Sequence, residues 1–291
     1  MFENQPKGLF ALALANTGER FGYYTMIAVF VLFLRANFGL DPGTAGMIYS
    51  VFLGLVYFLP LVGGVLADKF GFGKMVTIGI VVMFLGYLFL SIPLGGETFA
   101  LLVMLLALLF ISFGTGLFKG NLQAIVGQMY DNLEAEAAKK GPEAMKAVQG
   151  RRDSGFQIFY VFINIGGLVA PFIAPYLREW WLSTKGLLYN AELPALCHKF
   201  LGHVNMTGDE TSNLNKLMGE VGGNVNDMAA ACSTYLDTFN TGVHYSFIAS
   251  VVAMLLSLFI FIAFKKIFPT PSKKEAQAAV EYTAEEKLAM G

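Results

Sequence analysis

Residues 99–118 read FALLVMLLALLFISFGTGLF and contain no charged side chain. The hydrocarbon core of a bilayer is about 30 Å thick, and an α-helix of about 20 predominantly apolar residues crosses it. This stretch therefore predicts a membrane-spanning helix. The whole chain agrees, because only 14% of its 291 residues are charged, against roughly 25% in an average soluble domain. The expected fold class is an all-α membrane protein.

Similar apolar stretches elsewhere bring the expected number of spans to six, at 8–34, 44–67, 75–93, 99–127, 154–176 and 244–264. The chain then divides into helices one to five (1–176), an insertion (177–243), helix six (244–264) and a charged linker or tail (265–291). The insertion has helix-like patterning around 194–204 and 212–239.

Lysine and arginine concentrate in the loops on one side of these spans, whereas the short loops on the other side hold only Arg35. Basic loops remain in the cytoplasm. We therefore expect a multi-pass protein of the cell (inner) membrane, with both termini cytoplasmic and the insertion on the opposite side. The net charge of −1 gives no electrostatic reason to expect nucleic acid as a partner. The expected surroundings are the lipid bilayer.

The two cysteines, Cys197 and Cys232, both lie in the insertion. A disulfide can persist there if the insertion faces an oxidising compartment. Free thiols are the first alternative. A metal site with His198 and His203 is the second, although the spacing matches no standard zinc pattern. We favour the disulfide and expect no metal site.

Charged residues inside the spans are the strongest functional signal, because a charge in the bilayer centre costs about 2.5–3.5 kcal/mol on insertion scales. Glu19 and Arg20 lie in the first span, and Lys119 lies near the end of the fourth. They form either the wall of a water-filled cavity or, for the first two, a structural ion pair. Neighbouring residues on a helix point in different directions, so we expect Glu19 and Arg20 each to meet a partner elsewhere. Lys119 follows glycines that favour close helix packing, and its alternative is to snorkel to the membrane surface.

Four stretches carry these residues. They read NTGERFGYY (16–24), GGVLADK (63–69), GLFKGN (116–121) and FYVFINIGGL (159–168). In this order they resemble motifs of the proton-coupled oligopeptide transporters, a branch of the major facilitator superfamily. The first is similar to Glu-x-x-Glu-Arg-Phe-x-Tyr-Tyr on helix one, and the last is similar to Phe-Tyr-x-x-Ile-Asn-x-Gly-(Ser/Gly)-Leu on helix five. The resemblance implies the N-terminal six-helix bundle of that superfamily, built from two three-helix units.

The resemblance also implies a function, the import of di- and tripeptides by secondary active transport, with protons as the coupling ion and no cofactor. It implies that Arg20 and Lys119 bind the peptide carboxyl end and that Glu19 couples transport to protons. It also implies that Asn164 binds the peptide backbone. The aromatic residues that would form the pocket wall are Tyr23, Tyr24 and Tyr57. A lone tyrosine or asparagine in a span is otherwise more often an interhelical hydrogen-bond donor.

Two departures from the family pattern matter. Asn16 replaces the first glutamate of the helix-one motif, which puts proton coupling in question, since an amide does not titrate. The family has two six-helix halves, whereas this chain has six spans, so we expect a second half in cis or in trans. The alternative function is a non-transporting membrane subunit or adaptor that binds a partner through the insertion and the polar helix face. An intramembrane enzyme is not expected, because the spans hold no nucleophile–base pair.

Overall fold

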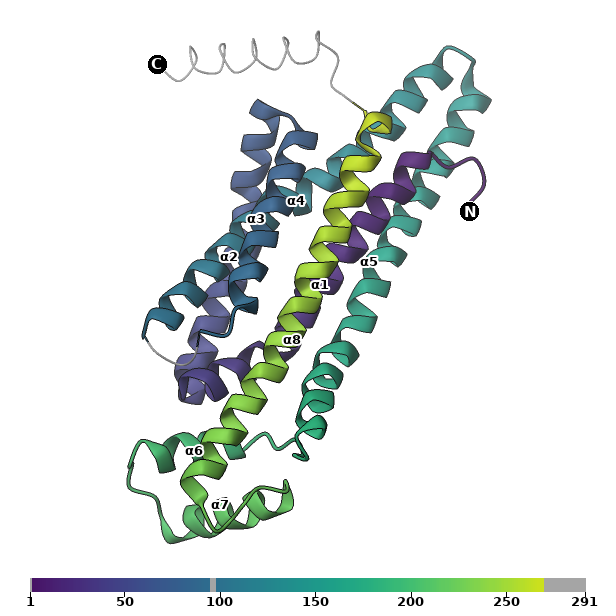
Figure 1. Ribbon diagram of the computed structural model, residues 1–291. Coiled ribbons are helices and arrows are strands. Elements are labelled where there is room, and N and C mark those ends of the chain that lie inside the picture. The colour runs from purple at the N-terminus through teal and green to yellow at the C-terminus, as the bar shows by residue number, and fades with distance from the viewer. Residues whose placement is uncertain (1, 95–97, 270–291) are drawn as a thin grey trace, which may run out of the picture.

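The computed structural model describes residues 2–94 and 98–269 and contains helices and turns, with no strand in these ranges. Six helices are long and apolar enough to cross a membrane: α1 (Lys7–Phe38), α2 (Pro42–Phe70), α3 (Phe72–Ser91), α4 (Thr98–Ala138), α5 (Pro142–Thr184) and α8 (Met228–Ala263). Two short helices, α6 (Leu193–Leu201) and α7 (Gly208–Glu220), and one 3-10 turn (Lys265–Ile267) complete the described part of the chain (Figure 1). The all-α membrane class is confirmed.

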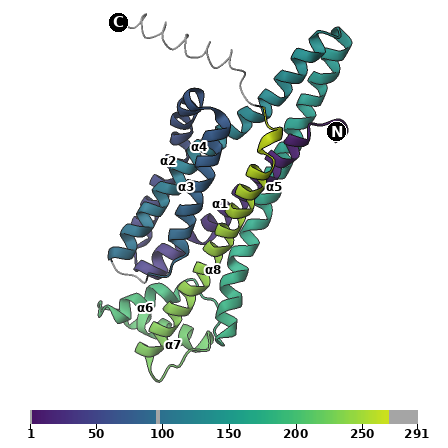
Figure 2. The same cartoon turned by 45° about the horizontal axis from the view of Figure 1, so that its top comes forward.

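The helices are longer than hydropathy predicts. Helix α4 continues to Ala138, and α5 begins at Pro142, so the two form a hairpin that projects beyond α2 and α3 (Figures 1 and 2). Helix α8 begins at Met228, so the helical pattern expected over 212–239 is divided between α7 and the start of α8. These extensions are amphipathic or polar, and a search for apolar runs does not detect them.

Local sequence signals fix the turns between spans. Helix α1 ends at Gly39, whose φ of 62° is the left-handed conformation that glycine adopts without strain. The Asp41 carboxylate then caps α2, because its Oδ1 accepts hydrogen bonds from the Gly43 and Thr44 amides at 2.8 and 3.1 Å. Pro42 stands at the first helical position, where its missing amide hydrogen is not needed. The chain therefore reverses within a few residues and places α2 antiparallel to α1.

The pattern of helix contacts shows the two three-helix units. Helix α1 packs against α5 and α8, and α4 packs in the same way against α2 and α3. If α1, α2 and α3 exchange places with α4, α5 and α8, one set of contacts becomes the other. Helices α3 and α8 meet each other between the two sets. This is the arrangement expected when two three-helix repeats of inverted topology form one bundle.

Small residues allow the closest of these approaches. A Cβ added to Gly63 of α2 would overlap the carbonyl group of Gly116 on α4. The equivalent contact between α5 and α1 places Gly166 against the Thr17 carbonyl, and the Thr17 hydroxyl donates a 2.9 Å hydrogen bond to the Phe162 carbonyl. Hydroxyl bonds of this kind hold helices together where apolar burial alone gives little driving force in lipid.

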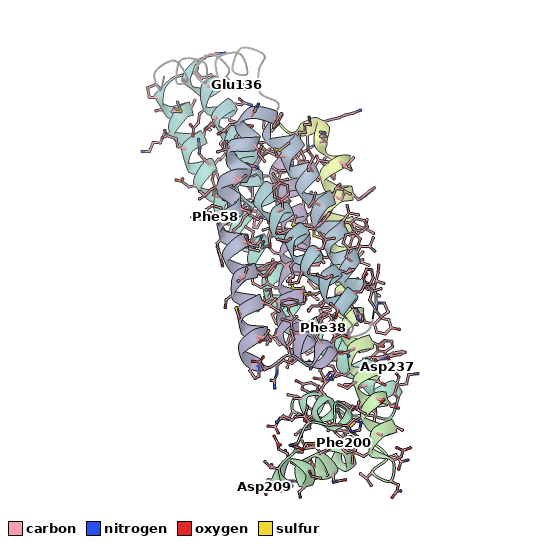
Figure 3. The ribbon with its side chains drawn as sticks, turned by 90° about the vertical axis from the view of Figure 1, so that its left-hand side faces the viewer. Phe38, Phe58, Glu136, Phe200, Asp209 and Asp237 are labelled. Atoms are coloured by element: carbon pink, nitrogen blue, oxygen red, sulfur yellow. The ribbon has the colours of Figure 1, made fainter. Side chains whose placement is uncertain are left out.

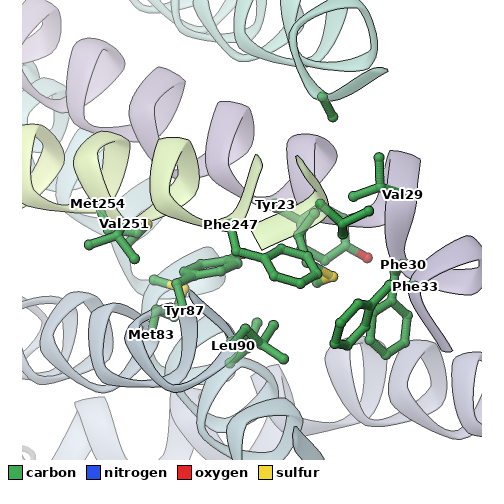
Figure 4. Packing of buried hydrophobic residues seen from close by; sticks show 14 of the residues in the cluster. Tyr23, Val29, Phe30, Phe33, Met83, Tyr87, Leu90, Phe247, Val251 and Met254 are labelled. Carbon is green, nitrogen blue, oxygen red and sulfur yellow. The ribbon is translucent and has the colours of Figure 1, made fainter. Parts of the chain in front are cut away.

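Behind these contacts lies one continuous apolar core. Figure 4 shows its centre, where Tyr87 and Met83 of α3 lie beside Phe247, Val251 and Met254 of α8. Phe33 of α1 meets Phe247 edge to face, with ring centroids 5.1 Å apart. The core therefore joins α1, α3 and α8.

The insertion forms a compact cap at one end of the bundle, opposite the end that holds the N-terminus and the end of α8 (Figure 1). Its α7 begins with a capping box, in which Thr207 and Glu210 satisfy each other's backbone amides. In Figure 3, Phe200 and Asp209 of the cap lie beyond Phe38 at the end of α1, and Glu136 of the α4–α5 hairpin lies at the far end.

Hydrogen bonds dock the cap onto the spans. The Ala36 carbonyl of α1 accepts from a ring nitrogen of His198 at 2.6 Å and from the Asn240 amide at 3.2 Å. The Arg178 guanidinium lies 3.7 Å from the centroid of the Tyr189 ring, a close cation–π contact. One ring nitrogen of His198 thus helps to hold the cap on α1.

Cys197 and Cys232 are buried between α6 and α8, and both are free thiols. The Cys197 thiol donates a hydrogen bond to the Cys232 sulfur. This bond, together with burial, raises the pKa of Cys197 well above its ordinary value. The two side chains predicted to form a disulfide therefore do lie together, and the disulfide itself stays a prediction.

Candidate functional site

The residues predicted to form the site fall into a buried group and an open group. Glu19 is fully buried, and Arg20 and Tyr23 are 7% and 5% exposed. Tyr57 is 69% exposed, and Tyr24 is 38% exposed. Asn164 is also exposed, whereas Lys119 is half-buried. Helix α1 therefore turns its charged pair into the bundle, whereas Tyr24 of the same helix, Tyr57 and Asn164 are exposed.

Glu19 and Arg20 bind each other. The Arg20 Nε lies 2.5 Å from Glu19 Oε2, and its Nη2 lies 2.9 Å from Oε1, so the pair is bidentate. The prediction that each meets a partner elsewhere is wrong. Both side chains are long enough to bend toward each other although their Cα–Cβ directions differ. Burial then favours the pair, because an unpaired charge in a low-dielectric interior is costly.

Aromatic rings flank the charges. The Arg20 guanidinium carbon lies 5.3 Å from the centroid of the Tyr23 ring. The Lys119 ammonium of α4 lies 4.8 Å from the centroid of the Tyr57 ring of α2. Such contacts attract a cation to the ring face without neutralising it. They hold both cations in place and leave their charge available.

Lys119 interacts electrostatically with both Arg20 and Glu19. Among the residues that the structure describes, no carboxylate forms a salt bridge with Lys119. Arg20 and Lys119 together carry two positive charges, and Glu19 supplies one negative charge. The site therefore has an excess of one positive charge, which favours an anionic ligand. Lys119 extends from α4 to the Tyr57 ring of α2, and its place in a cavity wall stays a prediction.

Helix α5 supplies the other side of the open group. Tyr24 packs on the α5 backbone, where a Cβ on Gly167 would lie 3.1 Å from its ring. Asn164 precedes Gly167 by one helical turn and points away from the packed seam, since it is exposed. Tyr23 joins the two groups, because its ring meets that of Tyr24 edge to face with centroids 5.3 Å apart.

One residue of the site was missed by sequence reasoning. Tyr87 of α3 is fully buried, and within the described chain its hydroxyl has no hydrogen-bond partner. It interacts electrostatically with Glu19, Tyr23 and Arg20. The signal in the sequence is a single phenol in the apolar run of the third span, which on its own does not differ from an ordinary core tyrosine.

Comparison with known proteins identifies the family of the chain. Residues 73–282 match the POT family. The Di-/tripeptide transporter of Lactococcus lactis subsp. lactis is 35% identical over 227 residues, which are 73% of this chain and 41% of that protein. The uncharacterized transporter YclF of Bacillus subtilis is 36% identical over 198 residues, 66% of this chain and 35% of that protein. The chain thus spans less than half the length of these relatives.

Solved structures give the same result. A crystal structure of peptide transporter POT in complex with sulfate superposes with a TM-score of 0.58 at 27% identity, over 100% of this chain and 46% of that chain. A POT variant in complex with alafosfalin gives a TM-score of 0.59 at the same identity, over 100% of this chain and 47% of that chain. The family match extends over most of the chain, and the six-helix bundle is found within longer transporters. This chain is a multi-pass membrane protein that belongs to the POT family.

Proposed function

We propose that this chain is the N-terminal six-helix half of a secondary active transporter that imports di- and tripeptides with protons. The observation that carries the proposal is the excess positive charge of the site, where Arg20 and Lys119 face one carboxylate, Glu19. A peptide at neutral pH brings a free carboxylate, and two cations in a cleft of low dielectric would bind it strongly. The Lactococcus relative named as a di-/tripeptide transporter supports the same substrate class.

The second part of the proposal is a second six-helix half, in cis or in trans. Tyr57 is exposed beside the half-buried Lys119, and Asn164 of α5 is exposed as well. Lipid cannot hydrogen-bond these groups, so a polar face of this kind requires a protein or water-filled interior. The solved relatives are about twice as long as the region that this chain matches. Transport by alternating access also requires two bundles that rock about a site between them.

Proton coupling is assigned to Glu19. The paired carboxylate holds Arg20, and a proton on Glu19 would release the guanidinium toward the peptide carboxylate. The proton and the peptide charge would then enter together, so the net charge of the site would not change. Asn16 leaves Glu19 as the carboxyl of the helix-one motif, so coupling rests on this residue. The predicted location is the inner membrane, with both termini cytoplasmic, since lysines and arginines concentrate on the side of the termini.

Uptake of labelled dipeptide by the complete transporter in proteoliposomes tests the peptide site. Lys119→Ala is expected to abolish uptake with membrane levels unchanged, because it removes one cation that forms no salt bridge within the described residues. Lys146→Ala, an exposed lysine of the α4–α5 hairpin, is the matched control and is expected to transport normally. Normal uptake by Lys119→Ala would contradict the site. Binding of a protein partner without any peptide uptake would instead favour the adaptor function.

An imposed pH gradient tests the coupling. The wild type is expected to concentrate peptide only with an inward proton gradient, and Glu19→Gln is expected to lose this concentration. Asn16→Glu adds a second titratable group one helical turn away, and we expect steeper dependence on pH. If Glu19→Gln concentrates peptide as well as the wild type does, Glu19 is not the coupling residue.

A further inference from the structure

Tyr87 is the unexplained polar group of the core. Its side chain is fully buried between α3, α8 and α1, among Met83, Phe247 and Met254 (Figure 4). Its hydroxyl has no partner within the described residues. Removing a hydroxyl from water without a compensating hydrogen bond costs free energy. Phenylalanine would fill the same space without that cost, so the hydroxyl has no structural role in this state of the protein.

The charged groups around Tyr87 belong to the site. Glu19 and Arg20 interact with it electrostatically from α1, as does Tyr23. Lys119 of α4 interacts with the same Glu19 and Arg20. From α8, His244 approaches α3 one turn away, where a ring nitrogen lies 2.9 Å from the Leu90 carbonyl. The Ser250 and Ser257 hydroxyls of α8 already donate to carbonyls of α1. The unpaired hydroxyl therefore lies within electrostatic reach of the ion pair.

We propose that Tyr87 is a positioning residue for the coupling step, in which its hydroxyl receives the protonated carboxyl of Glu19 when Arg20 is released to substrate. This inference rests on the proposed role of Glu19. In the structure both Glu19 oxygens bond to Arg20. Once a proton adds to Glu19, the carboxyl group becomes a donor and loses its attraction for the guanidinium. A buried O–H group then requires an acceptor, and a tyrosine oxygen can accept while its own hydrogen still donates.

The step is balanced in charge and hydrogen bonds. Glu19 gains one proton. This proton stays on the carboxyl group and donates a hydrogen bond to the Tyr87 oxygen. Arg20 loses one carboxylate, and the peptide carboxylate takes its place. The resting and the protonated arrangements bury the same side chains of this chain. Tyr87 has a hydrogen-bond partner only in the protonated arrangement. The phenol thus lowers the free energy of the protonated, substrate-ready arrangement relative to the resting one.

Infrared spectroscopy of the complete transporter in lipid tests the hydrogen bond directly. A protonated carboxyl has a carbonyl stretch whose frequency rises when its hydrogen bond is lost. We expect such a band in the wild type at low pH with peptide present, and its absence in Glu19→Gln identifies it. In Tyr87→Phe the band is expected at higher frequency, and gradient-driven peptide concentration is expected to fall several-fold.

Ser112→Ala is the matched control, because Ser112 is also fully buried with a hydroxyl that lacks a partner in the described chain. We expect it to leave both the band and the uptake unchanged. Both variants remove an unpaired polar atom, so neither is expected to lower the unfolding temperature. A Glu19 band at the same frequency in Tyr87→Phe would overturn this inference and leave the proposed function standing. The absence of any Glu19 band in the wild type would overturn the coupling role of Glu19, and this inference with it.

Discussion

Two carboxylate–cation pairs of the same length lie in opposite surroundings. In the bundle, Arg20 Nε lies 2.5 Å from Glu19 Oε2, with side chains 9% and 0% exposed. In the cap, Lys199 Nζ lies 2.5 Å from Glu210 Oε1, with side chains 45% and 30% exposed. Water solvates Lys199 and Glu210 whether or not they pair, whereas the buried charges of Arg20 and Glu19 have only each other. Contact distance therefore does not measure what a pair contributes, and burial does.

The same contrast distinguishes the bundle from the cap as a whole. In the bundle, helices approach through glycines and buried hydroxyl bonds, and the polar groups inside are few and specific. In the cap, stability comes from local signals, such as the Thr207 capping box, and from docking contacts at Ala36 and Tyr189. Charge in the bundle is thus available for function, while charge in the cap serves solubility and local structure.

The largest expected effect comes from removing one partner of the buried Glu19–Arg20 pair. Arg20→Ala leaves the Glu19 carboxylate buried without a cation, and removal of one partner of a buried pair costs about 3–5 kcal/mol. We expect a clear loss of thermal stability in the purified protein, measured by a dye-free unfolding scan.

Combined Glu19→Gln and Arg20→Gln substitution is the control, because it removes both charges and leaves neutral amides that can hydrogen-bond each other. It is expected to recover most of the stability. If the single variant is as stable as the wild type, the pair is not buried as the structure shows, and the comparison with the cap fails.

The next effect concerns the cap, where Cys197 and Cys232 are adjacent. If this end faces an oxidising compartment, we expect a disulfide, which stabilises by about 2–4 kcal/mol. Thiol labelling after denaturation without reductant is expected to detect no free thiol in protein taken from the membrane. Cys197→Ser and Cys232→Ser are expected to be equally less stable, and reductant is expected to destabilise only the wild type. Full labelling of both thiols would show that the pair stays reduced.

Much of the fold could be predicted from the sequence, because lipid imposes one simple requirement on it. The run 99–118 must be a helix if it crosses the bilayer, and the same holds for the other spans. The extensions of α4, α5 and α8 could not be predicted in this way, since hydropathy carries no signal once a helix leaves the bilayer. Pro171 and Pro175 lie inside α5, and the span predicted at 154–176 already contained both.

For the site, the resemblance assigned Arg20, Tyr23, Tyr57 and Lys119 to one pocket, and the structure places Arg20 against Tyr23 and Lys119 against Tyr57. The direction of the Glu19 side chain could not be predicted, because it depends on rotamers and on the neighbours across α1. Tyr87 could not be predicted either, since its relation to Glu19 arises only when α3 packs beside α1 and α8. A motif can be read directly along the sequence, whereas a contact with a residue of another helix appears only in the folded structure.

The smallest expected effect is the loss of the exposed pair in the cap. Hydrogen bonds from Lys199 and from the Thr207 amide lower the pKa of Glu210 below its ordinary value. A carboxyl with a lower pKa in the folded state contributes stability above its unfolded pKa, and this contribution disappears as the pH falls through the folded pKa. Because the pair is exposed, salt and solvent screen it, and such pairs contribute little.

We therefore expect Glu210→Gln to change the unfolding temperature only slightly at neutral pH and not at all at acidic pH, below the folded pKa of Glu210. Scans of the wild type and variant at both pH values, at low and high salt, measure the difference. The glutamine keeps the capping acceptor for the Thr207 amide, so the comparison reports the charge rather than the cap. A loss as large as that of Arg20→Ala would mean that the cap is stabilised in the same way as the bundle, and the contrast drawn from burial would be wrong.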